Sequence, residues 1–114
     1  MLRKYGPSLQ AQISEDAFLR QVLGLARWFK WMTAHFRPAM SKRGRWITAV
    51  QGDGAGFPDL VLVRAPRVIF AELKSAKGKL SGDQEAWLLA LAGTPIESYV
   101  WRPAQIDEVE RILK

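Results

Sequence analysis

The stretch Asp59-Leu60-Val61-Leu62-Val63-Arg64, followed by Ala65-Pro66 and then by Arg67-Val68-Ile69-Phe70-Ala71-Glu72-Leu73-Lys74, decides the fold of this chain. Both arms are rich in the β-branched and aromatic residues that favour strands, and the proline between them predicts a turn. If the hairpin folds symmetrically about Ala65-Pro66, the Cα atoms of Asp59 and Glu72 face each other at roughly 4.5–5.5 Å. A loop of odd length would shift this register.

Side chains alternate along a strand, so Lys74 shares a face with Asp59 and Glu72. Both faces are otherwise apolar, as in central strands that are covered on two sides. Charged groups are rare in such surroundings unless they are paired or hold a metal. Two carboxylates around a divalent cation, with a lysine beside them, form a compact arrangement for metal-assisted cleavage of a phosphodiester. A simple ion pair at a sheet edge is the alternative.

Composition limits the possible functions. With 114 residues the chain is expected to form one domain over 1–114, and the absence of cysteine excludes disulfides and thiolate zinc sites and suits a reducing cytoplasm. No apolar stretch is long enough to span a membrane, and no secretory leader is evident. The net charge is +6, and residues 1–45 hold nine Lys and Arg against two acids. This imbalance favours a polyanionic partner such as nucleic acid, although it would also serve solubility alone.

Signals for helix starts, helix ends and turns divide the chain into a simple order of elements. Residues 1–12 read as a loose lead-in. Ser14 is a good N-cap for a helix reaching about Trp31, and Ser81-Gly82-Asp83-Gln84 is a capping-box signature for a helix ending near Gly93. The other expected elements are a basic loop over 33–45, a first strand over 46–51, the two hairpin strands, a strand over 97–102 and a last helix from Pro103 to Leu113. The order predicts an α/β domain with a mixed sheet.

This order and these motifs resemble the PD-(D/E)xK nuclease superfamily, and most closely its virus-type replication-repair nuclease family, VRR-NUC. The resemblance runs from Glu15 to about Trp101 and rests on Gly56-Phe57-Pro58-Asp59-Leu60-Val61-Leu62, Phe70-Ala71-Glu72-Leu73-Lys74-Ser75, Gly78-Lys79-Leu80-Ser81-Gly82-Asp83-Gln84 and Trp87. It implies a restriction-endonuclease-like α-β-β-β-α-β core with a mixed central sheet, to which the C-terminal helix is an addition.

The resemblance also implies roles for single residues. Asp59, Glu72 and the main-chain carbonyl of Leu73 would hold Mg²⁺ or Mn²⁺, which suits an all-oxygen site. Lys74 would orient the attacking water and offset charge on the phosphate. Glu15 matches a first-helix glutamate used at the metal, although the helix dipole alone favours an acid there. Gln84 matches a second-helix glutamine near the active site, and the capping box gives an equally good reason for it.

Two basic clusters are candidates for DNA contact. Lys77 and Lys79 follow the catalytic strand directly, and Lys42, Arg43 and Arg45 form a second cluster in the basic loop. Neither cluster has the pattern of a base-reading motif, so recognition through phosphates and DNA shape is expected. Solvated loops are the alternative for both clusters.

The five tryptophans bear on assembly, because a domain of this size need not bury all of them and exposed aromatics often mark interfaces. Small members of the resembled family are symmetric homodimers that cut four-way junctions. The resemblance therefore implies a structure-selective endodeoxyribonuclease, a dimeric Holliday junction resolvase of a bacterial or phage-infected cytoplasm, with no organic cofactor and no membrane partner. A monomeric nuclease for flaps or nicks and a catalytically idle DNA-binding module remain alternatives.

Overall fold

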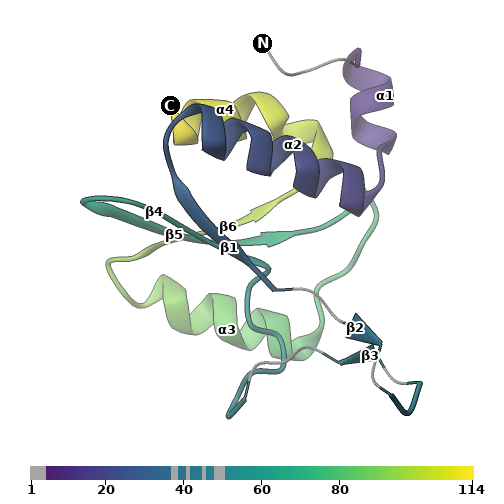
Figure 1. Ribbon diagram of the computed structural model, residues 1–114, viewed down its shortest axis with the longest axis vertical. Coiled ribbons are helices and arrows are strands. Elements are labelled where there is room, and N and C mark those ends of the chain that lie inside the picture. Colours follow the sequence, from purple (N-terminus) through teal and green to yellow (C-terminus); the bar gives the residue numbers. More distant parts are fainter. Residues whose placement is uncertain (1–4, 37–38, 41, 45, 48–50) are drawn as a thin grey trace.

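The computed structural model describes residues 5–36, 39–40, 42–44, 46–47 and 51–114. A four-stranded sheet in the order β1-β4-β5-β6 forms its centre. The sheet is mixed, because β1, β4 and β5 are antiparallel neighbours while β6 runs parallel to β5. Helices α2 and α4 lie on one side of this sheet and α3 lies on the other (Figure 1). The bounds are β1 Met32–His35, β4 Leu60–Arg64, β5 Arg67–Leu73, β6 Glu97–Trp101, α2 Glu15–Trp28, α3 Gly82–Ala92 and α4 Ile106–Leu113.

The central hairpin has the symmetric register that the sequence predicts. Leu60 faces Ala71, and Arg64 faces Arg67 at the turn. One step beyond the last paired residues, the same register sets Asp59 opposite Glu72. The hairpin side chains that face α2 and α4 are buried: Leu60, Leu62, Ile69, Ala71 and Leu73.

The core lies between this face of the sheet and helices α2 and α4. Ser14 caps α2 as predicted, since its hydroxyl accepts from the main-chain N–H of Ala17 at 3.0 Å. Burying an aliphatic or aromatic side chain stabilises a fold by about 1.5–3 kcal/mol, so this layer carries most of the stability. The helix residues buried in it are Phe18, Leu19, Val22, Leu25, Ala26, Ile106, Val109 and Leu113.

The first strand of the main sheet is β1, so its predicted position over 46–51 is wrong. Trp46–Ile47 is a short strand, β3, but it pairs with β2 (Ala39–Met40) in a separate two-stranded sheet. Residues 48–50 lie outside the described residues. All four residues of β1 are exposed, so the strand shows no apolar alternation. Residues 32–35 form a strand because they pair with β4 through main-chain hydrogen bonds. Such pairing cannot be predicted from the pattern of side chains.

Residues 7–12 form a short helix, α1 (Pro7–Gln12), where the sequence indicated a loose lead-in. Pro7 stands at the first turn, where its fixed φ favours a helix. The side chain of Gln10 is buried, exchanges hydrogen bonds with Gln21 and donates to the carbonyl of Pro103 at 3.0 Å. These contacts hold α1 to the far end of the chain. Pro103–Gln105 is a 3-10 turn, so α4 begins three residues later than predicted.

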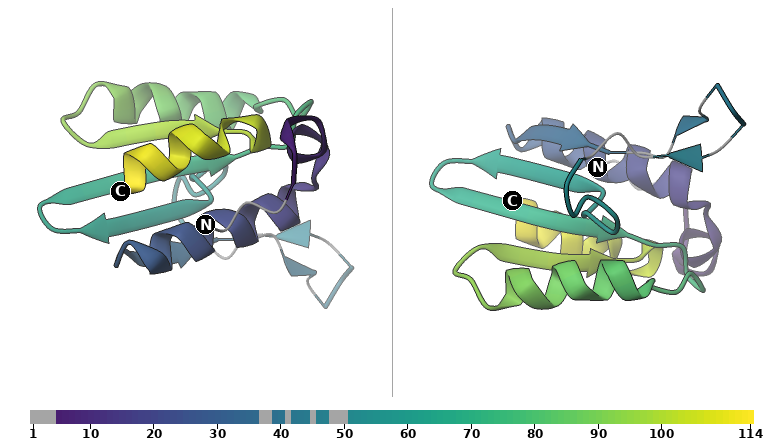
Figure 2. Two further views of the ribbon diagram at one scale, coloured as in Figure 1. Left: turned by 90° about the horizontal axis from the view of Figure 1, so that it is seen from above. Right: turned by 90° about the horizontal axis from the view of Figure 1, so that it is seen from below.

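The second face of the sheet is only partly covered. Helix α3 packs along β6, and seen from the α3 side much of β4 stays uncovered (Figure 2, right). Met32 and its register partner Val63 are therefore exposed, Met32 by 77%. On α3 itself Leu89 is 78% exposed, and no residue of the helix is buried. Of the tryptophans, Trp31 and Trp101 are buried, whereas Trp28 is exposed.

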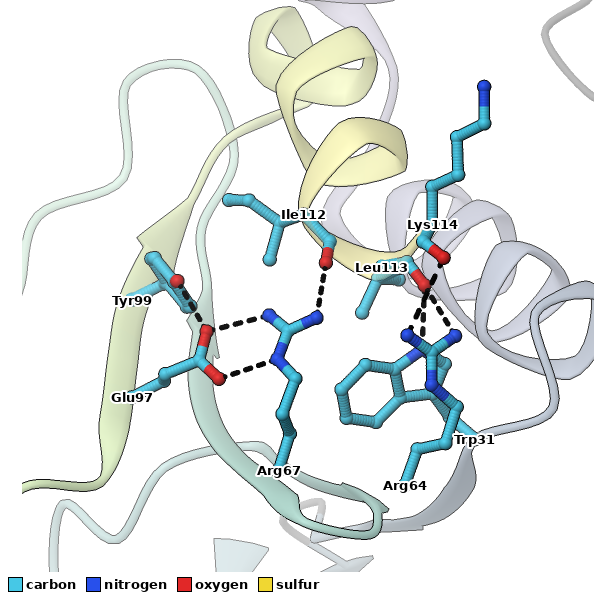
Figure 3. A network of polar contacts seen from close by, with 8 residues as sticks. All are labelled: Trp31, Arg64, Arg67, Glu97, Tyr99, Ile112, Leu113 and Lys114. Carbon is cyan, nitrogen blue, oxygen red and sulfur yellow. Dashed lines mark hydrogen bonds and ion pairs between the residues drawn. The ribbon is translucent and has the colours of Figure 1, made fainter.

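An arginine pair at the hairpin turn holds the C-terminal helix (Figure 3). Arg64 donates to the carbonyls of Phe29 and Leu113 at 2.9 and 3.0 Å, and Arg67 donates to that of Ile112 at 2.9 Å. Both guanidinium groups lie over the Trp31 ring, at 4.6 and 5.1 Å from its centroid. The carbonyls of Ile112 and Leu113 lie in the last turn of α4 and have no hydrogen-bond partners within the helix. The two arginines therefore provide the donors for them.

Arg67 also forms a two-pronged ion pair with the carboxylate of Glu97, at 2.7 and 2.8 Å. The pairing lowers the pKa of Glu97 and raises that of Arg67. The pair ties the hairpin to the first residue of β6. Among the described residues, no helix has the length and apolar character needed to cross a membrane.

Candidate active site

Asp59 and Glu72 meet at the end of the central hairpin, as the register predicts. The Asp59 carboxylate accepts the main-chain N–H of Leu73 at 2.9 Å, a bond that fixes it against strand β5. The Glu72 side chain is hydrogen-bonded to the Asp59 carboxyl and is only 2% exposed. Asp59, just before β4, and Glu72, in β5, are thus held together at one end of the two central strands.

The environment of Glu72 favours its protonated form. Burial is the main cause, followed by the hydrogen bond to Asp59 and the negative charge of that residue, and together they raise the pKa of Glu72 to about 9. The positive charge of Lys74 acts in the opposite direction. Glu72 therefore holds its proton at neutral pH, and a cation bound between the two carboxyl groups would displace that proton.

Gln84 reaches this pair from the first turn of α3. Its side-chain nitrogen donates to a carboxylate oxygen of Glu72 at 3.0 Å. Its side-chain oxygen accepts the main-chain N–H of Ser81 at 2.8 Å, while Ser81 caps the Gln84 N–H at 3.1 Å. The capping box predicted for Gln84 is present, and the other end of the same amide group contacts Glu72. A part for Gln84 in catalysis stays a prediction.

The glycine loop before Asp59 sets where α3 begins. Gly56 has φ +80°, and a Cβ atom there would lie 2.4 Å from the main-chain carbon of Asp83. Only glycine permits this approach. Beside it, the ring of Phe57 makes edge-to-face contacts with Phe36, Phe70 and Trp87. The loop thus presses against the first turn of α3 and positions Gln84.

Lys74 follows β5 directly and is half-buried. Its main-chain N–H donates to the carbonyl of Trp101 at 3.0 Å, which extends the pairing of β5 with β6 by one residue. A Cβ atom on Gly78 would lie 3.4 Å from the Lys74 side chain, so the chain turns closely around this lysine. Glu72, Leu73 and Lys74 are therefore held in one rigid segment.

Arg102 is a residue of this region that the sequence did not single out. One guanidinium nitrogen donates to the carbonyls of Ser75 and Gly78, both at 2.7 Å. It braces the loop that follows β5. The parallel pairing of β5 with β6 could have indicated it, because the carboxyl ends of parallel strands meet at one edge of a sheet.

Glu15 stands at the start of α2, where it is exposed. Its negative charge is the smallest of the causes that raise the pKa of Glu72. Over residues 5–36 and 51–114 and the short described stretches between them, no three His, Cys, Asp or Glu side chains form a group that could hold a metal ion. A role for Glu15 at the metal remains a prediction.

The two basic clusters differ in their relation to the site. Lys77 and Lys79 are exposed on the loop between β5 and α3, next to Lys74. Lys42 and Arg43 are exposed in a turn beside the separate two-stranded sheet, and Arg45 lies outside the described residues. The first cluster follows Glu72 and Lys74 closely along the chain.

Comparison with protein families matches residues 24–105 to the VRR-NUC domain. The match spans more than half of the chain and includes both acids, Lys74 and Gln84. The chain belongs to the VRR-NUC family. The VRR-NUC match starts after Glu15, so that residue lies outside it. Neither the curated proteins nor the solved structures contain a match.

VRR-NUC domains are nuclease domains with DNA as the substrate, and the fold agrees with the restriction-endonuclease-like arrangement expected of them. In this VRR-NUC domain the donor set fits a hard divalent cation. The carboxyl groups of Asp59 and Glu72 lie together, and a divalent cation bound there would offset the negative charge of both. The predicted carbonyl ligand of Leu73 belongs to the residue whose N–H holds Asp59.

Proposed function

We propose that this domain is a Mg²⁺- or Mn²⁺-dependent, structure-selective endodeoxyribonuclease that acts as a dimeric Holliday junction resolvase. The single observation that carries the catalytic part is the contact of Glu72 with Asp59 and Gln84 in a buried place beside Lys74. An idle binding module would gain nothing from keeping two acids in contact there, because burying them unpaired costs stability.

Each residue has a distinct part in the proposed reaction. Asp59, Glu72 and the carbonyl of Leu73 would hold the cation, which when bound supplies an activated water and stabilises charge on the phosphate. Lys74 orients the attacking water and offsets negative charge that develops on the phosphoryl oxygens. Gln84 is a positioning residue, because its amide holds the Glu72 carboxylate in one orientation.

The uncovered half of the sheet supports the dimer. Met32 and Val63 are register partners on neighbouring strands, and their exposed side chains form adjoining apolar surface, while Leu89 of α3 is exposed as well. Adjoining apolar surface gains stability when a partner covers it. A two-fold dimer would present two active sites to a symmetric four-way junction, which one domain cannot do.

The DNA-binding surface would begin at the loop that carries Lys77 and Lys79. Its positive charge lies beside the acidic pair, so a phosphate backbone bound there would pass the proposed metal site. The turn with Lys42 and Arg43, together with Arg45, would contact DNA farther from the scissile bond.

Cleavage assays on labelled four-way junction, flap and linear duplex DNA test the proposal. Purified protein is incubated with each substrate in Mg²⁺ or Mn²⁺, beside Lys74→Ala and an EDTA control. We expect paired symmetric incisions in the junction, lost in EDTA and reduced by at least about 100-fold in the variant, since one transition-state donor contributes that much.

The other outcomes separate the alternatives. Cutting confined to flaps or duplex would keep the chemistry and favour the monomeric nuclease. Tight DNA binding without metal-dependent cutting would overturn the enzyme and leave a binding module.

A further inference from the structure

A pocket lies between the α1–α2 junction and the loop that follows β5, next to the proposed active site. Its volume is about 270 Å³, and it is lined by Ala11, Gln12, Ile13, Ser75, Ala76 and Lys77. Pockets that hold drug-sized ligands range from about 300 to 1,000 Å³, so this one has room for a single ring system and not for a dinucleotide.

The two walls of the pocket come from segments that are far apart in the sequence, residues 11–13 and 75–77. One wall is the junction between α1 and α2, which ends two residues before Glu15. The other wall begins at Ser75, the residue after Lys74, and Arg102 holds the Ser75 carbonyl at 2.7 Å. The pocket therefore adjoins both the lysine and the helix end whose glutamate acts on Glu72.

The wall formed by the α1–α2 junction is held in place by hydrogen bonds. Helix α1 is held by the buried Gln10, which is bonded to Gln21 on α2 and to the carbonyl of Pro103. Residues 11–13 thus have a fixed position relative to the core. A cavity with two braced walls keeps its shape without a ligand, which lowers the entropy cost of binding.

The lining has the chemistry of a nucleobase site. Ala11, Ile13 and Ala76 offer aliphatic surface for the faces of a ring, while Gln12 and Ser75 offer groups that can bond a base edge. The ammonium group of Lys77 suits the phosphate attached to such a base. A phosphate alone would find too few polar partners in a lining that is mostly aliphatic.

We infer that this pocket receives one unstacked nucleobase of the DNA strand that passes the metal site. A base leaves the stack most easily at a branch point, nick or flap, where its neighbours are already unpaired. The pocket would thereby favour branched DNA over continuous duplex. This inference rests on the proposed function, because it requires DNA at the active site.

Equilibrium binding to DNA with single abasic positions tests the pocket. In a Lys74→Ala background, in which cutting is expected to be slow, an abasic nucleotide is moved one position at a time along the strand that crosses the branch. Affinity is measured by fluorescence anisotropy. We expect one position at which the missing base weakens binding at least about fivefold, the lower end of what holding one base contributes.

Two further variants locate the effect. Ala76→Trp fills the pocket and should weaken binding of intact DNA by a similar factor, with no additional loss from the abasic nucleotide. Gln12→Ala adds no bulk and should weaken intact DNA about 2- to 10-fold, the value of one hydrogen bond. The abasic loss at the sensitive position should shrink by the same factor, because the other contacts of the base remain. Ala65→Trp, at the far end of the same hairpin, is the matched control and should bind like the parent.

A flat abasic series would overturn the inference even if Ala76→Trp binds poorly, because the pocket would then contact backbone or another partner. Unchanged binding by both pocket variants would overturn it as well. The nuclease proposal fails separately: absence of metal-dependent cutting by the wild-type chain, with the abasic pattern intact, would remove the enzyme and keep the pocket.

Discussion

The side-chain amide of Gln84 donates to the Glu72 carboxylate at 3.0 Å and at its other end accepts the N–H that opens helix α3. One residue therefore joins the start of a helix to a buried acid of the neighbouring strand. The helix can shift only if the acid shifts with it, so the catalytic geometry depends on how α3 is placed.

Replacing Gln84 by glutamate separates these two functions. Gln84→Glu keeps the acceptor of the capping box but loses the donor to Glu72 and adds a negative charge beside it. We expect cleavage to fall about 10- to 100-fold, as is found for residues that orient metal ligands, with little change in melting temperature. Metal titrations of the cleavage rate provide the measurement. Asp83→Asn, an exposed change in the same turn, is the control; equal rates for both variants would contradict the role of Gln84.

The raised pKa of Glu72 makes the stability of the metal-free protein depend on pH. The folded state holds a proton on this residue up to a pH of about 9, whereas the unfolded chain loses it near 4.5. Stability from this group is thus present below pH 4.5 and is lost as the pH rises through 9. We expect Glu72→Gln, which cannot ionise, to melt at higher temperature than wild type in EDTA at pH 8, by a margin that grows from pH 5 to 8.

Added Mg²⁺ should reverse this difference, since it binds the folded wild type and displaces the proton. Melting curves at several pH values, with and without Mg²⁺, provide the measurement. Glu85→Gln, an exposed glutamate of α3, controls for the loss of one charge. Parallel profiles for wild type and Glu72→Gln would show that the acid is not the titrating group.

The glycine loop offers a matched pair of substitutions. Gly56 and Gly52 both have positive φ, but only at Gly56 would a Cβ collide with backbone, since the space around Gly52 is open. Gly52→Ala should cost about 1–2 kcal/mol from its backbone conformation. Gly56→Ala should cost about 1–3 kcal/mol more from overpacking, and should also lower cleavage because α3 and Gln84 must move. Urea unfolding checks this; similar losses for both would mean that the contact with Asp83 is not tight.

The arginine pair in Figure 3 is expected to affect stability without affecting chemistry. Arg64→Met removes two short hydrogen bonds from main-chain carbonyls and should destabilise the fold by about 2–4 kcal/mol. Cleavage per folded molecule should stay near wild type, because Arg64 is at the hairpin turn and the acids are at the opposite end. Arg111→Met, exposed on α4, is the control in denaturant unfolding. A selective loss of activity in Arg64→Met would contradict this separation.

The proposed dimer can be tested by two neighbouring substitutions. Met32→Asp places a charge on the uncovered face, whereas Thr33→Asp places the same charge on the next residue, whose side chain alternates to the other face. We expect sedimentation of wild type and Thr33→Asp at twice the 12.9 kDa chain mass and of Met32→Asp at the single mass. The monomeric variant should no longer make paired incisions. A wild type that already sediments as one chain would remove the resolvase proposal.

The acids could be predicted from sequence because the interactions that place them are local. Asp59 and Glu72 are joined by a short hairpin, so strand alternation and the turn set their register. Gln84 could be predicted for the same reason, since its capping box spans four residues. Strand β1 could not be predicted, because all four of its residues are exposed and they show no apolar alternation.

The sequence by itself thus determined the central hairpin, the capped helices, the family and the acidic pair, all encoded in patterns within short stretches of chain. Only the tertiary structure decided which strand stands beside β4, how much of the sheet α3 covers and what surrounds the site. Arg102 contacts a loop 27 residues away, and Gln10 contacts a residue 93 positions away. Such contacts form only when helices and strands pack against one another. The free energy of that packing comes from side chains far apart in the sequence, so no local pattern predicts it.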